Sequence, residues 1–182
     1  MTSVRKANIT SLANADIASL ANTGLPSTEA TAGLANADTT NLSKTKADIT
    51  SLARTRALAR ELAQKIAPAR PLLLFGGLGA GKTELAREAI RLLTGEKNAP
   101  SPTFNILQTY GGGEVFHYDL YRLKSARELD ELDFDAALFE KKTIIEWPEI
   151  AEDYIDSRVR AIKVKMALDA DTNKRSAEIW NC

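Results

Sequence analysis

Residues 76–83 read Gly76-Gly77-Leu78-Gly79-Ala80-Gly81-Lys82-Thr83. This stretch follows the pattern G-x-x-x-x-G-K-T, which is typical of loops that hold nucleotide phosphates. Glycines let backbone N–H groups turn towards a phosphate, the lysine supplies positive charge, and the threonine hydroxyl can bind Mg²⁺. The stretch therefore predicts a phosphate-binding loop, and it decides what the rest of the chain has to provide.

The segments on either side of the loop have the order that such a loop requires. Residues 72–75 form a wholly apolar run, as expected of a strand buried on both faces. After the loop, Leu85 and Ala89 recur at helical spacing, and Gly95 is a residue type that ends helices. A glycine-rich turn without a ligand is the alternative, and the flanking strand and helix disfavour it. We therefore expect an α/β fold of the P-loop type, with a mostly parallel sheet flanked by helices.

Further elements can be predicted from the remaining patterns. Residues 55–66 are expected to form an amphipathic helix, and residues 99–119 an additional β-hairpin that turns at the three glycines 111–113. Ser125 opens an acidic helix through a capping box, and Asp135 is expected to cap a short helix that follows. Strands are predicted at residues 143–146, 160–168 and 175–180.

The first 49 residues differ in kind from the rest. They are rich in Ala, Asn, Thr, Ser and Asp, and they contain no aromatic residue. Too few large apolar groups are present to offset the entropy cost of ordering. We expect residues 1–49 to be a low-complexity, flexible extension and residues 50–182 to be the P-loop domain. A partner-binding arm is the alternative interpretation of the extension.

Composition narrows the class of protein. The chain has 182 residues, 44% of them apolar, and a formal net charge of zero, so no strong field indicates a nucleic acid or a membrane as partner. Charge is nevertheless uneven, with a net charge of +5 over residues 54–91 and −5 over residues 124–160. Cys182 is the single cysteine, which excludes an intrachain disulfide. No apolar stretch is long enough to span a bilayer, so we expect a cytoplasmic protein without a membrane partner.

A P-loop enzyme also needs an acid that holds Mg²⁺ or orients water. Glu146 ends a predicted strand, where parallel strands deliver ligands, and Asp119 is the second candidate. Either could instead be an ordinary surface carboxylate. His117 is the only histidine, and a histidine on a strand is more often structural than catalytic. Trp147 is expected to be half-buried, or else to shape the nucleotide pocket or a partner surface.

Four motifs together resemble a known family. GGLGAGKT, SPTF, HYDLYRL and IIEWPE, in this order over residues 50–182, closely resemble the bacterial TsaE family of ATPases. The resemblance implies a small P-loop fold that binds ATP and Mg²⁺ and hydrolyses ATP. It further implies a role in the threonylcarbamoyladenosine modification of tRNA, together with the proteins TsaD and TsaB, and contact with tRNA only through that complex.

The resemblance also implies roles for individual residues. Lys82, Asp119 and Glu146 match catalytic positions, and Thr83 and Glu146 match metal ligands. Trp147 matches the tryptophan that follows the metal-site acid, and Ser101 and Thr103 fall in a switch-like segment near the γ-phosphate. The residues expected to contact the nucleotide are Thr50, Leu52, Gly77, Leu78, Gly79, Ala80, Gly81, Lys82, Thr83, Asp119 and Arg175.

The chain departs from the family pattern at two of the expected nucleotide contacts and at one residue next to them. Gly77 and Leu52 stand where acidic residues are common, and Glu84 stands where a small hydroxyl residue is usual. None of these departures removes a phosphate or metal ligand. A P-loop kinase for small molecules remains one alternative, and a nucleotide-dependent binding module without significant hydrolysis is another.

Overall fold

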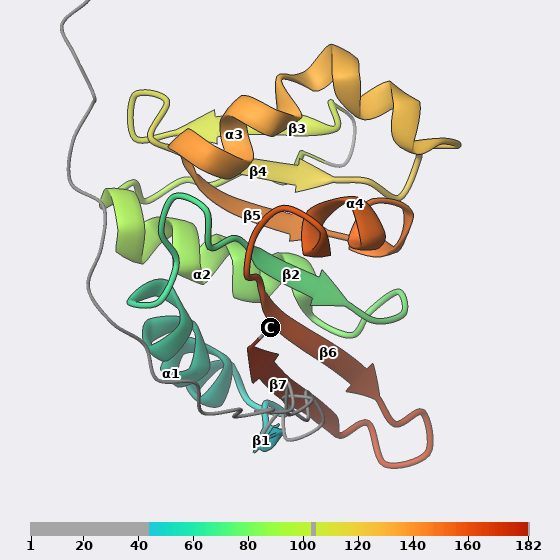
Figure 1. The fold of residues 1–182 in the computed structure, drawn as a ribbon. Helices are drawn as coiled ribbons and strands as arrows, with labels where there is room; N and C mark the ends of the chain where they lie inside the picture. The colour runs from blue at the N-terminus through green and yellow to red at the C-terminus, as the bar shows by residue number, and fades with distance from the viewer. Residues whose placement is uncertain (1–43, 103–104, 182) are drawn as a thin grey trace, which may run out of the picture. The chain divides into compact units, whose positions relative to one another are not determined.

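The structure is a computed structural model that describes residues 44–102 and 105–181. The described residues form strands and helices in mixed order, as Figure 1 shows. The strands are β1 (Thr45–Asp48), β2 (Leu72–Phe75), β3 (Leu107–Tyr110), β4 (Val115–Asp119), β5 (Lys142–Glu146), β6 (Ile162–Leu168) and β7 (Arg175–Asn181). The α-helices are α1 (Leu52–Ala63), α2 (Lys82–Thr94), α3 (Phe134–Glu140) and α4 (Glu152–Asp156), and the 3-10 helices are η1 (Ala126–Leu132) and η2 (Pro148–Ile150).

The described strands form one mixed sheet in the order β1-β7-β6-β2-β5-β4-β3. Its centre is parallel, because β4 pairs with β5, β5 with β2, and β2 with β6 in that sense. Antiparallel pairs extend both edges, with β3 on one side and β7 and β1 on the other. The α/β class and the additional hairpin of β3 and β4 are therefore confirmed.

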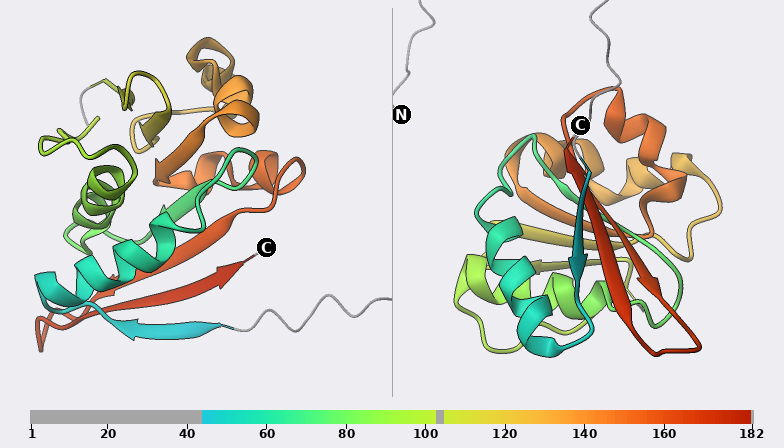
Figure 2. Two further views of the ribbon diagram at one scale, coloured as in Figure 1. Left: turned by 90° about the vertical axis from the view of Figure 1, so that its left-hand side faces the viewer. Right: turned by 90° about the horizontal axis from the view of Figure 1, so that it is seen from below.

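Each face of the sheet carries its own apolar core. Alternate residues of β2 point to opposite faces, so Leu72 and Leu74 join one core while Leu73 and Phe75 join the other. Helices α1 and α2 cover the first face, and η1, α3 and α4 cover the second. The two views of Figure 2 show the sheet between these groups of helices. Burial on both faces explains why β2 is apolar throughout.

Two helix starts differ from the sequence predictions. Helix α1 begins before Thr55, because the Ser51 hydroxyl accepts a hydrogen bond from the Arg54 N–H at 3.3 Å and so caps the helix. Helix α3 is preceded by Asp133 with a left-handed backbone (φ 50°), so the predicted cap at Asp135 is wrong. The Asp135 carboxylate instead accepts a hydrogen bond from the Tyr154 hydroxyl at 2.7 Å.

Strand β1 lies within the segment that was predicted to be an extension. It pairs antiparallel with β7, and Ile49, which follows it, is buried in the core under α1. The boundary between residues 49 and 50 therefore cuts through an ordered part of the sheet unit. The sequence suggested otherwise because β1 is short and mostly exposed, which leaves no apolar alternation to recognise. Residues 1–43 lie outside the described residues, and their predicted character stays a prediction.

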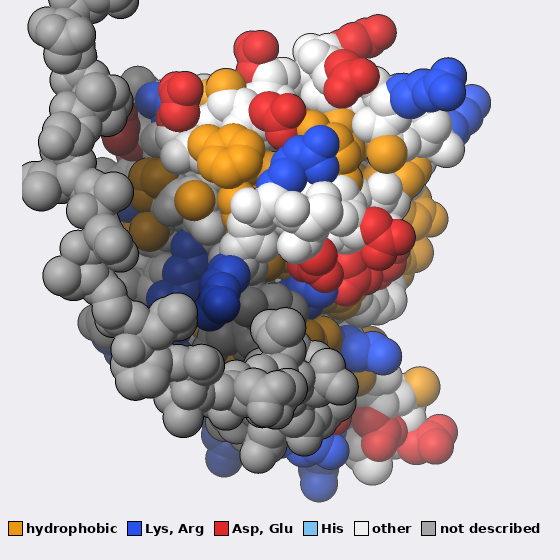
Figure 3. Space-filling view, viewed as in Figure 1, with side chains coloured by type: hydrophobic (Ala, Val, Ile, Leu, Met, Phe, Trp, Pro, Cys, Tyr) orange, Lys and Arg blue, Asp and Glu red, His pale blue; other side chains and the backbone are white. Residues whose placement is uncertain are grey.

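The charge asymmetry of the sequence is visible on the surface. Acidic side chains gather over η1, α3 and α4 on the face shown in Figure 3, and these elements belong to the segment of net charge −5. Among the described helices, none combines the length and the apolar character needed to cross a membrane.

Gly76 should be the least replaceable glycine of the phosphate loop. Its backbone has φ 133°, and a Cβ added there would lie 2.1 Å from the carbonyl oxygen of Met166 on β6. That atom belongs to a central strand and cannot move aside. We expect Gly76→Ala to lower the free energy of unfolding by about 2–3 kcal/mol, measured by urea denaturation.

The neighbouring Gly77 provides a matched control for this change. A Cβ added at Gly77 meets no atom within 4 Å, and its φ is not positive. Gly77→Ala should therefore shift the denaturation midpoint little. Equal stability of the two variants would contradict the contact between Gly76 and Met166.

Candidate functional site

The phosphate loop connects the end of β2 to the start of α2. Gly79 (φ 75°) and Gly81 (φ 103°) have left-handed backbones that residues with a side chain rarely adopt. Gly81 is the residue immediately before the helix, so the first N–H groups of α2 face the concave side of the loop. Strand, loop and helix thus follow the predicted order, and they form a site suited to an anion.

Lys82 is the first residue of α2, and its side chain extends back across the phosphate loop. Its ammonium group donates hydrogen bonds to the carbonyl oxygens of Gly76 at 2.7 Å and Gly77 at 2.9 Å. The same nitrogen lies 3.6 Å from the centroid of the Trp147 ring, a cation–π contact. Burial lowers the pKa of Lys82, and the nearby carboxylates of Glu146 and Glu149 oppose this effect. The two hydrogen bonds thus hold the Lys82 side chain at the loop before any ligand arrives.

Thr83 and Glu146 meet beside Lys82. Glu146 ends β5, the strand next to β2, and the Thr83 hydroxyl donates a hydrogen bond to its Oε2 at 2.8 Å. A hydroxyl and a carboxylate are oxygen ligands of the kind that Mg²⁺ takes in sites that also bind phosphate. The donor set that the sequence predicted is thus brought together in space, and it fits Mg²⁺.

Asp119 lies at the end of β4, in register with Glu146 on the adjacent strand. Its carboxylate accepts a hydrogen bond from the backbone N–H of Tyr121 at 3.2 Å. Both acids open onto a cavity of about 370 Å³ beside the phosphate loop. The cavity is lined by Leu78, Gly79, Gly81, Lys82, Thr83, Glu84, Asp119, Tyr121, Arg122, Glu146 and Trp147.

A second cavity of about 250 Å³ lies on the side of β1 and α1. Its lining includes the predicted nucleotide contacts Thr50, Leu52 and Arg175, together with Ala80 of the loop. Gly79, Gly81 and Glu84 line both cavities, so the two are adjacent along the loop. Together the cavities could take an elongated ligand with its anionic end at the first and its other end at the second.

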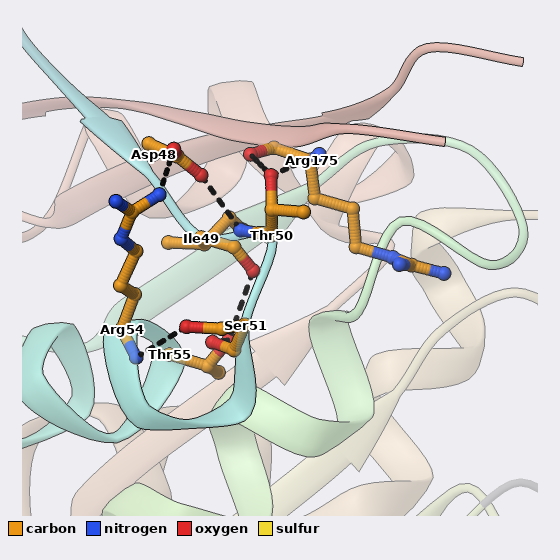
Figure 4. A network of polar contacts seen from close by, with 7 residues as sticks. All are labelled: Asp48, Ile49, Thr50, Ser51, Arg54, Thr55 and Arg175. Atoms are coloured by element: carbon orange, nitrogen blue, oxygen red, sulfur yellow. Dashed lines mark hydrogen bonds and ion pairs between the residues drawn. The ribbon is translucent and has the colours of Figure 1, made fainter. Parts of the chain in front are cut away.

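A network of polar contacts fixes the second cavity (Figure 4). The Thr50 hydroxyl accepts a hydrogen bond from the Arg175 backbone N–H at 3.0 Å and donates one to the Arg175 carbonyl at 3.3 Å. The Arg175 side chain extends from β7 towards the phosphate loop and donates from Nε to the Gly79 carbonyl at 3.2 Å. On the other side of Thr50, Asp48 forms an ion pair with Arg54. The predicted residues Thr50 and Arg175 therefore touch each other as well as the cavity.

Some residues that were predicted to lie at the nucleotide site do not line either cavity. Gly77 lines neither cavity and contributes its carbonyl to Lys82 instead. Ser101, in the predicted switch segment, is half-buried and also lines neither cavity. Thr103 lies outside the described residues.

Two neighbours of the site were not predicted from the sequence. The Tyr121 ring packs on Trp147 at 4.7 Å between ring centroids, and His117 contacts Glu146. The spacing of HYDLYRL placed His117 and Tyr121 near Asp119, but only the pairing of β4 with β5 brings them to Glu146 and Trp147.

Comparison with known proteins identifies similar chains. Residues 49–177 match the family model "Threonylcarbamoyl adenosine biosynthesis protein TsaE". The chain is 44% identical over 117 residues to the tRNA threonylcarbamoyladenosine biosynthesis protein TsaE of Rickettsia felis, covering 63% of this chain and 67% of that one. The equivalent protein of Rickettsia conorii is 43% identical, with coverage of 63% and 65%. The chain thus matches about two thirds of the length of these relatives.

A solved structure shows the same fold. The crystal structure of Bacillus subtilis YdiB superposes with a TM-score of 0.57 at 24% sequence identity, covering 76% of this chain and 86% of that one.

Proposed function

The chain belongs to the TsaE family of threonylcarbamoyladenosine biosynthesis proteins, and we propose that it binds ATP with Mg²⁺ and hydrolyses the ATP. One observation carries this proposal. The Lys82 side chain and the hydrogen-bonded pair of Thr83 and Glu146 line the same cavity at the phosphate loop. Asp119 lines the same cavity. Charge, metal ligands and a second carboxylate are the parts that phosphoryl transfer to water requires.

The expected reaction is in-line attack of water on the γ-phosphorus of ATP, with ADP as the leaving group. Lys82 and the backbone N–H groups of the loop stabilise the negative charge that develops on the phosphate oxygens. Thr83 and Glu146 would hold Mg²⁺, which would supply positive charge that offsets the negative charge of the phosphates. Asp119 orients the attacking water or the segment that contacts it.

The remaining cavity residues fit the rest of the nucleotide. Thr50, Leu52 and Arg175 line the second cavity, so they are suited to the nucleoside side of ATP. Arg122 lines the phosphate-side cavity and Arg175 lines the second cavity, so Arg122 is better placed than Arg175 to approach developing charge. In this assignment Arg175 supports binding rather than the chemical step.

The biological role follows from the family. Hydrolysis would serve the threonylcarbamoyl modification of tRNA in the cytoplasm, acting with partners of the TsaD and TsaB type and meeting tRNA through them. A pull-down of the full chain with TsaD and TsaB proteins from the same organism, with and without ATP and Mg²⁺, tests the partnership. Release of phosphate from ATP without transfer to a panel of metabolites tests hydrolysis against a kinase activity. Phosphorylation of a metabolite would overturn hydrolysis as the activity. Absence of TsaD and TsaB from the bound fraction would overturn the partnership.

Trp147 should report the binding of ATP. Phosphate binding would draw the Lys82 ammonium away from the Trp147 ring, which now lies 3.6 Å from it, and would thereby change the fluorescence of that indole. The chain has one other tryptophan, Trp180, which stacks on Phe75 away from both cavities. We expect Trp147→Phe to remove essentially all of the ATP-dependent change in emission, and Trp180→Phe to retain it. The reverse result would place the nucleotide elsewhere.

A further inference from the structure

His117 has a contact that the proposed reaction does not use. It is the only histidine of the chain, and its Nε2 lies 3.0 Å from Oε1 of Glu146. The other carboxylate oxygen, Oε2, accepts the hydrogen bond from Thr83. Both members of the histidine–glutamate pair are almost fully buried, with side chains 1% and 2% exposed. Glu146 is thus held between an imidazole on one oxygen and the candidate metal ligand Thr83 on the other.

Sheet register explains why these side chains meet. His117 on β4 stands opposite Ile144 on β5, two residues before Glu146. Alternate residues of a strand share a face, so His117 and Glu146 both point to the side covered by α2. Helix α2 contributes Thr83 from that side. Two parallel strands and one helix therefore fix the three side chains relative to one another.

The surroundings of His117 select one tautomer. Its Nδ1 is buried and has no hydrogen-bond partner among the described residues. A carboxylate oxygen only accepts hydrogen bonds, so the proton belongs on Nε2, where it points at Glu146. A proton on Nδ1 would leave a buried donor unpaired and would set the Nε2 lone pair against a carboxylate. We infer the Nε2–H form from these contacts.

We propose that His117 is a positioning residue, which fixes Oε1 of Glu146 and so keeps Oε2 directed at Thr83 and the Mg²⁺ site. Rotation of a carboxylate about its last torsion is otherwise broad and nearly two-fold, so anchoring one oxygen orders the other. Replacing a group that holds a metal ligand in this way typically weakens metal affinity by about 10- to 100-fold. The proposal rests on the metal-binding role given to Glu146 in the proposed function.

The alternative is that His117 only fills the core beside Tyr110, whose ring centroid lies 6.5 Å away. The two roles differ in what a substitution changes. A filler affects stability alone, whereas a positioning residue also affects metal binding. Val115, on the same face of β4 and buried in the same core, provides a matched control for a purely structural loss.

Nuclear magnetic resonance tests the tautomer without any ligand. Because the chain has a single histidine, a long-range ¹H–¹⁵N spectrum of the untagged ¹⁵N-labelled protein contains the signals of His117 alone. We expect the neutral imidazole to carry its proton on Nε2. A neutral ring with its proton on Nδ1, or rapid averaging between the two tautomers, would overturn the proposal.

Substitutions test the function of the contact. The amide nitrogen of His117→Gln can reach the place of Nε2 and donate to Glu146, whereas His117→Leu fills the space without a donor. We expect His117→Leu to raise both the dissociation constant for Mn²⁺ in the presence of ADP and the Mg²⁺ concentration for half-maximal ATP hydrolysis by about 10- to 100-fold. His117→Gln should recover most of this loss, and Val115→Ala should lower the melting temperature without changing either metal constant. If His117→Leu does not fold, His117→Asn replaces it, because its shorter amide retains polarity but does not reach Oε1.

The outcomes separate this proposal from the proposed function. Wild-type metal constants in a folded His117→Leu variant, or equal losses in the Gln and Leu variants, would overturn the positioning role while hydrolysis by the wild type stands. A wild type that binds Mn²⁺ with ADP but releases no phosphate would overturn hydrolysis, and the Mn²⁺ constants would still decide the role of His117. Failure of the wild type to bind Mn²⁺ with ADP would overturn the metal site and this proposal together.

Discussion

Replacing Lys82 with alanine should slow ATP hydrolysis by about 100- to 1000-fold and leave the protein folded. The Lys82 ammonium is the positive charge held at the phosphate loop, bonded to the carbonyls of Gly76 and Gly77. Its removal takes away the group that would stabilise the transferring phosphate, and it also frees the loop carbonyls. Steady-state phosphate release at saturating Mg²⁺ measures the effect.

Stability should change much less than activity. Burial lowers the pKa of Lys82, which means that the site disfavours the charged form to some degree, so loss of the charge also removes a desolvation cost. Thermal melting of Lys82→Ala beside the wild type checks this. Lys97→Ala is the matched control, because Lys97 is exposed and lines neither cavity of the site. A folded Lys82→Ala protein with the wild-type rate would refute the assignment of the phosphate loop.

Replacing Glu146 with glutamine should weaken Mg²⁺-dependent turnover far more than nucleotide binding. Glutamine keeps the size of the side chain and an oxygen that can accept from Thr83, but it loses the charge that a hard cation prefers. We expect the Mg²⁺ concentration for half activity to rise by at least about 10-fold and turnover to fall. Loop amides and Lys82 remain, so the dissociation constant for ATP should change little. Turnover measured against Mg²⁺ concentration gives both quantities.

Asp119→Asn is the comparison that separates the two acids. Asp119 accepts a backbone hydrogen bond from Tyr121, whereas the Thr83 hydroxyl donates to Glu146, so the expected role of Asp119 is to orient water or the adjoining segment. Its replacement should lower turnover and leave the Mg²⁺ concentration for half activity unchanged. A Glu146→Gln enzyme with the wild-type rate and Mg²⁺ dependence would remove the metal role from Glu146 and favour Asp119.

Much of this site follows from short stretches of sequence. The phosphate loop could be located because glycine, lysine and threonine at fixed spacing report a local backbone shape. Glu146 could be placed at a strand end because Ile144 and Ile145 directly before it are apolar, as residues of a buried parallel strand commonly are. The structure brings Lys82, Thr83, Asp119 and Glu146 to one cavity, which confirms that they are neighbours in space.

What the sequence did not predict depends on pairing between distant segments. The contact of His117 with Glu146 requires the register of β4 against β5, and no local pattern encodes a register between strands. Strand β1 acquires its place only by pairing with β7 at the far end of the chain. Helix α3 is preceded by Asp133 and not by the predicted Asp135. Asp133 has a left-handed backbone that joins η1 to α3, a turn that composition does not reveal.

The link between Thr50 and Arg175 determines where the chain can be shortened for recombinant work. A truncation that begins at residue 50 would remove β1 and the buried Ile49, whose N–H also donates to the Arg175 carbonyl at 3.0 Å. Strand β7 would then be an open edge, and Arg175 would lose a support for the side chain that reaches Gly79. Affinity tags and fusion partners are therefore best joined upstream of Lys44, so that the edge strand stays intact.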